Sequence, residues 1–131
     1  MASELRVNTL KDASGNNSVA TSVVFNGSAK AWVNFNGAGT VAIRDSYNIS
    51  SLTDSDVGIY TLSWSSNFAN DDYANAGTAG QNSNALVTVS CAIDTTAPTT
   101  SASLYNTNYE NGSSGRFDSN QVTIQVLGDL A

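Results

Sequence analysis

Short runs in which apolar and polar residues alternate recur along most of the chain, and they constrain its fold more than any other feature. The clearest run is ALVTVSCAI at 85–93, and similar runs lie at 59–66 and 121–129. Alternation with a period of two puts one face of a β-strand in a core and the other in solvent. Runs of good helix formers with a helical period are scarce. The sequence therefore predicts an all-β protein.

Turn-forming residues separate these runs. Asn26-Gly27 and Asn36-Gly37 are typical of tight hairpins, because both residue types tolerate a positive φ. About eight short strands at nearly regular spacing favour an antiparallel β-sandwich or a jelly-roll-like domain. The other expected strands lie at 5–9, 19–27, 29–37, 40–53 (breaking near Asp45) and 101–108, with a short strand near Tyr73 that a glycine-rich loop follows.

The same alternation predicts the side chains of the core. A chain reversal at Asn36-Gly37 would bring Trp32 to the same side as the residues of the following strand. The expected inward-facing residues are Trp32, Val41, Ile43, Tyr60, Leu62, Trp64, Val87, Val89, Cys91, Val122, Ile124 and Val126.

The chain has 131 residues, which suits one domain. We expect a short N-terminal arm at 1–25 and the β-sandwich module at 26–131. The apolar residues of the arm lie outside the expected core, so copies of the chain or another partner would cover them. In the alternative, the arm pairs with its own sandwich as an edge strand. The candidate assembly residues are Leu5, Val7, Leu10, Val23 and Phe25, with Val24 beside them.

Charge excludes one class of partner. The chain has five Lys and Arg residues and eleven Asp and Glu residues, so its formal net charge is −6. The five cations are scattered along the sequence. A protein that binds nucleic acid needs a basic patch, so we expect no nucleic-acid partner. The N-terminal segment lacks the apolar core of a signal peptide, and no apolar run approaches membrane-spanning length, so we expect synthesis in the cytoplasm without membrane insertion.

Few residue types that carry out catalysis are present. The chain has no histidine, which removes Ser-His-Asp triads, Cys-His pairs and imidazole zinc sites. Cys91 is the single cysteine, so it forms no internal disulfide, and its place in an alternating run indicates a small core residue. We expect no catalytic residues, no metal site and no cofactor.

Acidic pairs leave two alternatives open. The carboxylates of a small carbohydrate-active enzyme could come from Asp54 with Asp56, from Asp71 with Asp72, or from Glu110 or Asp118 across a loop. Asp71 and Asp72 could also contribute to an irregular calcium site, although the spacing after Asp54 does not match a calcium-binding EF-hand loop. All these residues lie in sequence typical of turns, where Asp bonds to nearby backbone. We therefore favour a structural role for them.

Tyrosines among asparagines are the candidate binding residues. Asparagine-flanked tyrosines in loops can stack on sugars or anchor a protein partner. They fall in two predicted loop regions, 67–84 and 105–120. The candidates are Tyr73, Asn75, Tyr105, Asn108 and Tyr109.

Three segments of the chain resemble a known class of protein. LRVNTLKDASGNNS at 5–18 resembles the N-terminal segment of tail-fibre and virion structural proteins of tailed phages, especially those that infect cyanobacteria and marine bacteria. The segment at 26–64, with the pattern KAW.NFNG.GT..IRDS.N.SS.TD...G.Y, is similar to a β-rich module at the ends of such fibres. DSNQVTIQVLGD at 118–129 resembles the last strand of that module.

This resemblance implies a location and partners. It implies a non-enzymatic virion protein, a tail-fibre-like appendage that contacts the host surface, with host-surface glycan as a candidate ligand. The expected assembly is a homotrimer that binds other virion proteins of the tail or capsid. The chain lacks the long shaft of such fibres, and the first alternative is a capsid decoration (cement) protein that stabilises the head.

Overall fold

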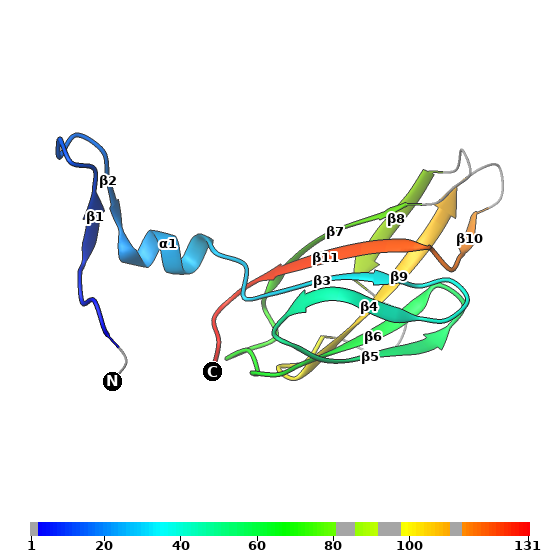
Figure 1. Cartoon of the computed structure of the whole chain (residues 1–131). Helices are drawn as coiled ribbons and strands as arrows, with labels where there is room; N and C mark the ends of the chain where they lie inside the picture. The colour runs from blue at the N-terminus through cyan, green and yellow to red at the C-terminus, as the bar shows by residue number, and fades with distance from the viewer. Residues whose placement is uncertain (1–2, 81–85, 92–97, 111–113) are drawn as a thin grey trace.

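The computed structural model describes residues 3–80, 86–91, 98–110 and 114–131. Figure 1 shows two antiparallel sheets packed face to face and an N-terminal segment that extends away from them. The prediction of an all-β sandwich is confirmed. The elements are β1 (Thr9–Lys11), β2 (Ser18–Ala20), α1 (Thr21–Gly27), β3 (Ala31–Asn36), β4 (Ala42–Tyr47), β5 (Ile49–Asp56), β6 (Ile59–Trp64), β7 (Ala74–Gly80), β8 (Leu86–Cys91), β9 (Ala102–Glu110), β10 (Ser114–Arg116) and β11 (Gln121–Leu127).

The two sheets of the sandwich have different strand orders. One sheet runs β4-β3-β11-β7, and the other runs β10-β9-β6-β5, with β8 on the remaining edge of β9. Strand β9 is long enough for β6 and β10 to share its opposite edge one after the other. The chain crosses between the sheets at Asn48, whose φ of 58° bends the backbone between β4 and β5. Asparagine is among the residue types that adopt this conformation most readily.

Aromatic rings and aliphatic side chains fill the space between the sheets. Phe35 meets Tyr60 edge to face, with ring centroids 5.0 Å apart, and Trp64 packs on Phe68 and Tyr73 at 5.4 and 5.9 Å. Six predicted core residues are buried, and Val41, Val89 and Cys91 are partly buried against them; the side chain of Val87 lies outside the described part. The confirmed buried residues are Tyr60, Leu62, Trp64, Val122, Ile124 and Val126.

The prediction that Trp32 and Ile43 face the core is wrong. Ala31, Val33 and Phe35 take the inward positions of β3, so Trp32 and Asn34 face outward. Ile43 lies on the edge strand β4 beside a bulge and is partly exposed. The bulge follows from two register pairs: Asn34 faces Asp45 and Phe35 faces Ile43, so Arg44 has no partner position.

Two further predictions of local structure are wrong. The expected strand at 19–27 contains the helix α1, because Val23, Val24 and Phe25 are consecutive rather than alternating and do not fit a half-buried strand. The expected glycine-rich loop after Tyr73 is instead the strand β7. Small residues suit this strand because a Cβ at Gly77 would lie 2.8 Å from the Thr123 carbonyl oxygen and 3.2 Å from Val89 Cγ1.

Two turns differ in detail from the prediction. Asn36-Gly37 begins the reversal between β3 and β4, but the positive φ belongs to Gly39, at 65°. The Asn36 Nδ2 group donates hydrogen bonds to the carbonyl oxygens of Ala38 and Thr40 at 2.7 and 2.9 Å, which holds the longer loop together. The break expected near Asp45 is a bulge there, and the strand itself ends before Asn48.

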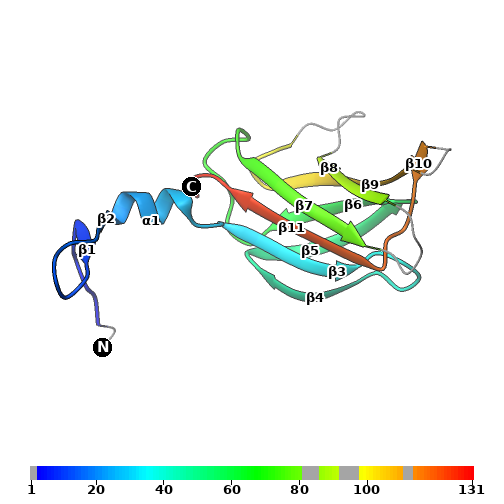
Figure 2. The same cartoon turned by 90° about the horizontal axis from the view of Figure 1, so that it is seen from above.

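The N-terminal arm consists of the β1–β2 hairpin and α1, and Figures 1 and 2 show it standing beyond one end of the sandwich. Helix α1 continues past residue 25, the expected end of the arm, to Gly27. Lys30 forms the joint: it is 5% exposed, and its ammonium group donates to the carbonyl oxygens of Phe25 and Ser28 at the end of the helix. Positive charge is favourable at a helix C-terminus.

Candidate binding surfaces

Two of the three tyrosines of the predicted binding site, Tyr73 and Tyr105, lie inside the molecule. Tyr73 is 7% exposed, and its hydroxyl group donates to the carbonyl oxygens of Thr99 and Ala102 at 3.1 and 3.2 Å. Tyr105 is buried in β9, and its hydroxyl group donates to Asn75 Oδ1 at 2.5 Å. The prediction of surface loop positions for these two tyrosines is wrong, because their rings complete the sandwich core. Burial also raises the pKa of both hydroxyl groups.

Both predicted asparagines bond to other side chains of the sandwich. Asn75 is partly buried and accepts the bond from Tyr105, so these two predicted residues meet inside the molecule. Asn108 lies on β9 and donates through Nδ2 to Ser90 Oγ at 3.1 Å. Tyr109 belongs to β9, but its side chain lies outside the described part of the chain.

Three of the acidic residues, Asp56, Asp72 and Asp118, make hydrogen bonds at turns or loops. Asp56 Oδ1 accepts from the Val57 N–H at 2.8 Å. The Asp72 N–H donates to Asn70 Oδ1 at 3.0 Å. Asp118 Oδ1 accepts from the Gly58 N–H at 2.7 Å and closes the β5–β6 turn. Within the described residues, no three His, Cys, Asp or Glu side chains form a group that could hold a metal ion.

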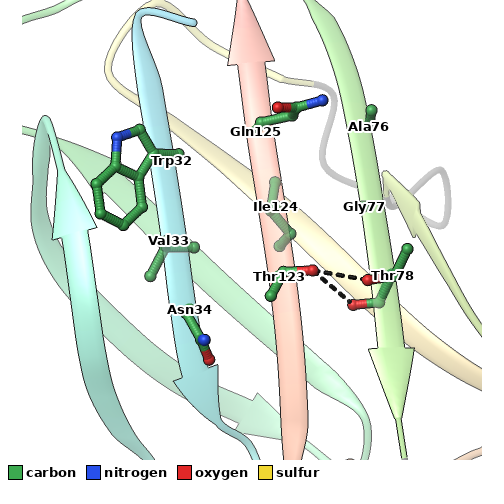
Figure 3. Close-up of a pocket in the computed structure, with 9 residues that line it drawn as sticks. All are labelled: Trp32, Val33, Asn34, Ala76, Gly77, Thr78, Thr123, Ile124 and Gln125. Carbon is green, nitrogen blue, oxygen red and sulfur yellow. Dashed lines mark hydrogen bonds between the residues drawn. The ribbon is translucent and has the colours of Figure 1, made fainter.

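A groove lies on the outer face of the β4-β3-β11-β7 sheet (Figure 3). It has a volume of about 570 Å³ and crosses three strands. The backbone pairing aligns its side chains in two rows across the sheet, Trp32–Gln125–Ala76 and Asn34–Thr123–Thr78. Val33, Gly77 and Ile124 lie between these rows and complete the lining.

Small side chains on β7 create this groove. Ala76, Gly77 and Thr78 rise little above the backbone, so the β7 side of the groove, next to β11, stays low. Thr78 Oγ1 and Thr123 Oγ1 share a hydrogen bond of 2.7 Å, and Figure 3 shows this pair on the groove floor. Gln125 is exposed, and its side chain makes no hydrogen bond with any described residue. The groove therefore offers several uncharged donors and acceptors to a ligand.

Trp32 lines the groove, and the exposed Tyr47 is its register partner on the next strand. Trp32 is 38% exposed and faces Tyr47, its neighbour on β4, which is 54% exposed. Figure 3 shows the Trp32 indole beside β3, on the side away from β11. Arg44 lies on the same face; its Nη2 donates to the Asn120 carbonyl oxygen at 2.6 Å and its Nη1 to Asn34 Oδ1 at 3.3 Å.

The sequence did not predict this groove, because Trp32, one of its lining residues, was expected to face the core. A signal was nevertheless present, because Asn34 and Asn36 share the parity of Trp32 in AWVNFN. Asparagine is seldom buried without partners, so two asparagines mark the outward face of the strand.

The arm carries the second candidate surface. The predicted assembly residues are all exposed: Leu5, Val7, Leu10, Val23 and Phe25. The strand β1 pairs with β2 of the arm, and the alternative of an arm strand on its own sandwich is not the observed arrangement. In the part of the chain that the structure describes, no helix is long and apolar enough to cross a membrane.

Comparisons with known proteins yield no relative. No protein-family model, curated protein or solved structure matches the chain. The resemblance to phage virion proteins therefore stays a prediction.

Proposed function

We propose that this chain is a non-enzymatic structural protein of a phage virion, a tail-fibre-like appendage that contacts the host surface. The observation that carries this proposal is the division of the molecule into an arm with exposed apolar side chains and a separately packed sandwich. The arm attaches the protein to copies of itself and to the virion, and the sandwich points away from the attachment.

The exposed apolar side chains of the arm support the attachment role. Phe25 is 55% exposed. Val23 and Val24 precede it in α1, and Leu10 lies on β1 of the hairpin; all three are exposed. An apolar surface on a projecting segment is costly in water, and association covers it. Cyclic symmetry would cover the same surface in every copy, and we propose a trimer.

The sandwich supports a binding role rather than catalysis. Asp118 and Asp56 are committed to backbone groups at turns, which accounts for these carboxylates without chemistry. The groove on the outer face presents Trp32 and uncharged polar side chains. Such a surface recognises a ligand through contact and hydrogen bonds.

The test is the place and copy number of the chain in purified virions from its source. Quantitative mass spectrometry should find it in every virion preparation, at a few dozen copies or fewer, because a tail carries few appendages. Hundreds of copies would instead support capsid decoration and overturn the tail assignment. Absence from virions would overturn the structural role altogether.

A further inference from the structure

We propose that the groove on the outer face of the β4-β3-β11-β7 sheet binds a neutral glycan chain. This inference rests on the proposed function, since it names the class of host-surface ligand that the appendage would contact. It also moves the binding site from the predicted loop tyrosines to the row Tyr47–Trp32–Gln125–Ala76, which crosses four strands.

The shape of the groove suits an extended ligand. Its volume of about 570 Å³ falls within the roughly 300–1,000 Å³ of small-molecule sites. Adjacent strands lie about 4.8 Å apart, so the span from β3 to β7 is roughly 10 Å. Both ends of the row are open, because Ala76 is small and exposed at one end and Tyr47 is exposed at the other. A chain of sugar rings can therefore cross the groove and continue beyond it.

Trp32 and the neighbouring Tyr47 supply the apolar contact that sugars need. One face of a pyranose ring carries mainly C–H groups, which pack on an aromatic ring, and the hydroxyl groups point outward from its edge. Trp32 and Tyr47 are cross-strand neighbours with exposed rings. Aromatic side chains of this kind lose little conformational entropy on binding and dominate the energetics of many interfaces.

The polar groups of the groove suit hydroxyl groups. The Gln125 amide offers donors and an acceptor and has no described partner. Asn34 accepts from Arg44 through Oδ1, which leaves its Nδ2 hydrogens for a ligand. The Thr78–Thr123 hydroxyl pair retains free lone pairs. Sugar hydroxyl groups both donate and accept, so they can satisfy all these groups together.

The absence of charged side chains in the lining of the groove favours a neutral ligand. The cationic Arg44 on the same face is engaged with the Asn120 and Phe35 carbonyl oxygens. Asp45 lies beside Arg44, and the whole chain has a net charge of −6. An anionic polymer would be repelled. A protein partner would favour a larger apolar centre than one indole and one phenol ring.

Affinity electrophoresis of the full chain in gels that contain soluble dextran, mannan, galactan or β-glucan tests this proposal. At least one of these neutral polysaccharides should retard the wild type, and polygalacturonate should not. Trp32→Ala and Gln125→Ala should each weaken the retardation by at least about fivefold, because hot-spot side chains contribute more than about 1 kcal/mol. Val57→Ala, an exposed apolar control on the β5–β6 turn, should bind like the wild type.

Tryptophan fluorescence gives an independent signal. The chain has two tryptophans, and Trp64 is buried in the core, so a sugar at the groove should change the emission of Trp32. Circular dichroism would confirm that each variant is folded. Three results would overturn the proposal: no binding to any of the four neutral polysaccharides, binding to polygalacturonate alone, or binding that neither variant weakens. Each of them would leave the virion role standing, because copy number tests that role separately.

Discussion

The buried hydroxyl group of Tyr60 ties the β3–β4 loop to the core. It donates to the Gly37 carbonyl oxygen at 2.8 Å, and its ring packs on Phe35. Burial, and then the negative charge of Asp118, raise the pKa of Tyr60 to about 12. Because an unfolded tyrosine ionises near pH 10, the folded state binds this proton more tightly.

This difference in pKa predicts a loss of stability in alkali. The contribution of Tyr60 is complete below about pH 10 and disappears as the pH rises from about 10 to about 12. Tyr60→Phe removes the hydrogen bond to Gly37, so it should lower the unfolding free energy by about 1 kcal/mol at neutral pH. Its unfolding free energy should then fall less steeply with pH than that of the wild type, as measured by urea unfolding at several pH values. Equal slopes for the two proteins would contradict the assignment.

Asn48 holds the crossing between the two sheets. Its φ is 58°, its Oδ1 accepts from the Ser66 N–H at 2.6 Å, and its Nδ2 donates to the Ser66 carbonyl oxygen at 3.1 Å. Asn48→Ala should destabilise the fold by about 2–4 kcal/mol, because it combines backbone strain with two lost hydrogen bonds. Asn48→Gly should cost less, since glycine relieves the strain and loses the bonds alone. Chemical denaturation of both variants measures the difference, and equal losses would show that strain plays no part.

The strand sequence AWVNFN shows how one residue can mislead prediction. The size of Trp32 suggests burial, but Val33 and Phe35 on the opposite parity can fill the core without burying Asn34. Two buried asparagines without partners would cost more than one partly exposed tryptophan. The groove was not predictable for the same reason, since Trp32, which lines it, was expected in the core.

The strand β7 depends on the absence of side chains where it meets its neighbours. A Cβ at Gly77 would lie 2.8 Å from the Thr123 carbonyl oxygen, whereas a Cβ at Gly80 would meet Gln121 Cβ at an ordinary 3.9 Å. Gly77→Ala should destabilise the protein by about 1–3 kcal/mol through overpacking. The matched control, Gly80→Ala, should be within about 1 kcal/mol of the wild type. Thermal unfolding compares them, and a neutral Gly77→Ala would indicate a loop rather than a packed strand.

Elements with strong alternation were predictable, and those with other signals were not. The strands β6, β8 and β11 follow directly from alternating apolar residues. In contrast, β7 has the composition of a loop, because its glycine serves close packing rather than a turn. The helix α1 contains β-branched residues that disfavour helices, so its sequence gave little indication of the structure.

At the scale of the whole molecule, the arm and the sandwich differ in how their side chains are packed. The sandwich has its own aromatic core, whereas the arm has a two-stranded hairpin and a short helix with no buried residue in the helix. Isolated hairpins and helices of this size are marginally stable in water. We therefore expect the arm to gain most of its stability from association.

Lys30 connects the arm to the sandwich. Its ammonium group lies 4.2 Å from the centre of the Phe25 ring and bonds to the carbonyl oxygens that end α1, while its backbone N–H donates to the Val126 carbonyl oxygen at 2.8 Å. One residue thus joins the last turn of the helix to the strand β11.

Sedimentation equilibrium of the full chain tests the role of the arm most directly. We predict a mass three times the 13.6 kDa of one chain. The double variant Val23→Asp, Phe25→Asp should dissociate to monomers with a folded sandwich, because buried unpaired carboxylates oppose association. Val57→Asp, with the same 55% exposure as Phe25 but on the sandwich, should remain trimeric. A monomeric wild type, or a trimer that the arm variant leaves intact, would contradict this account.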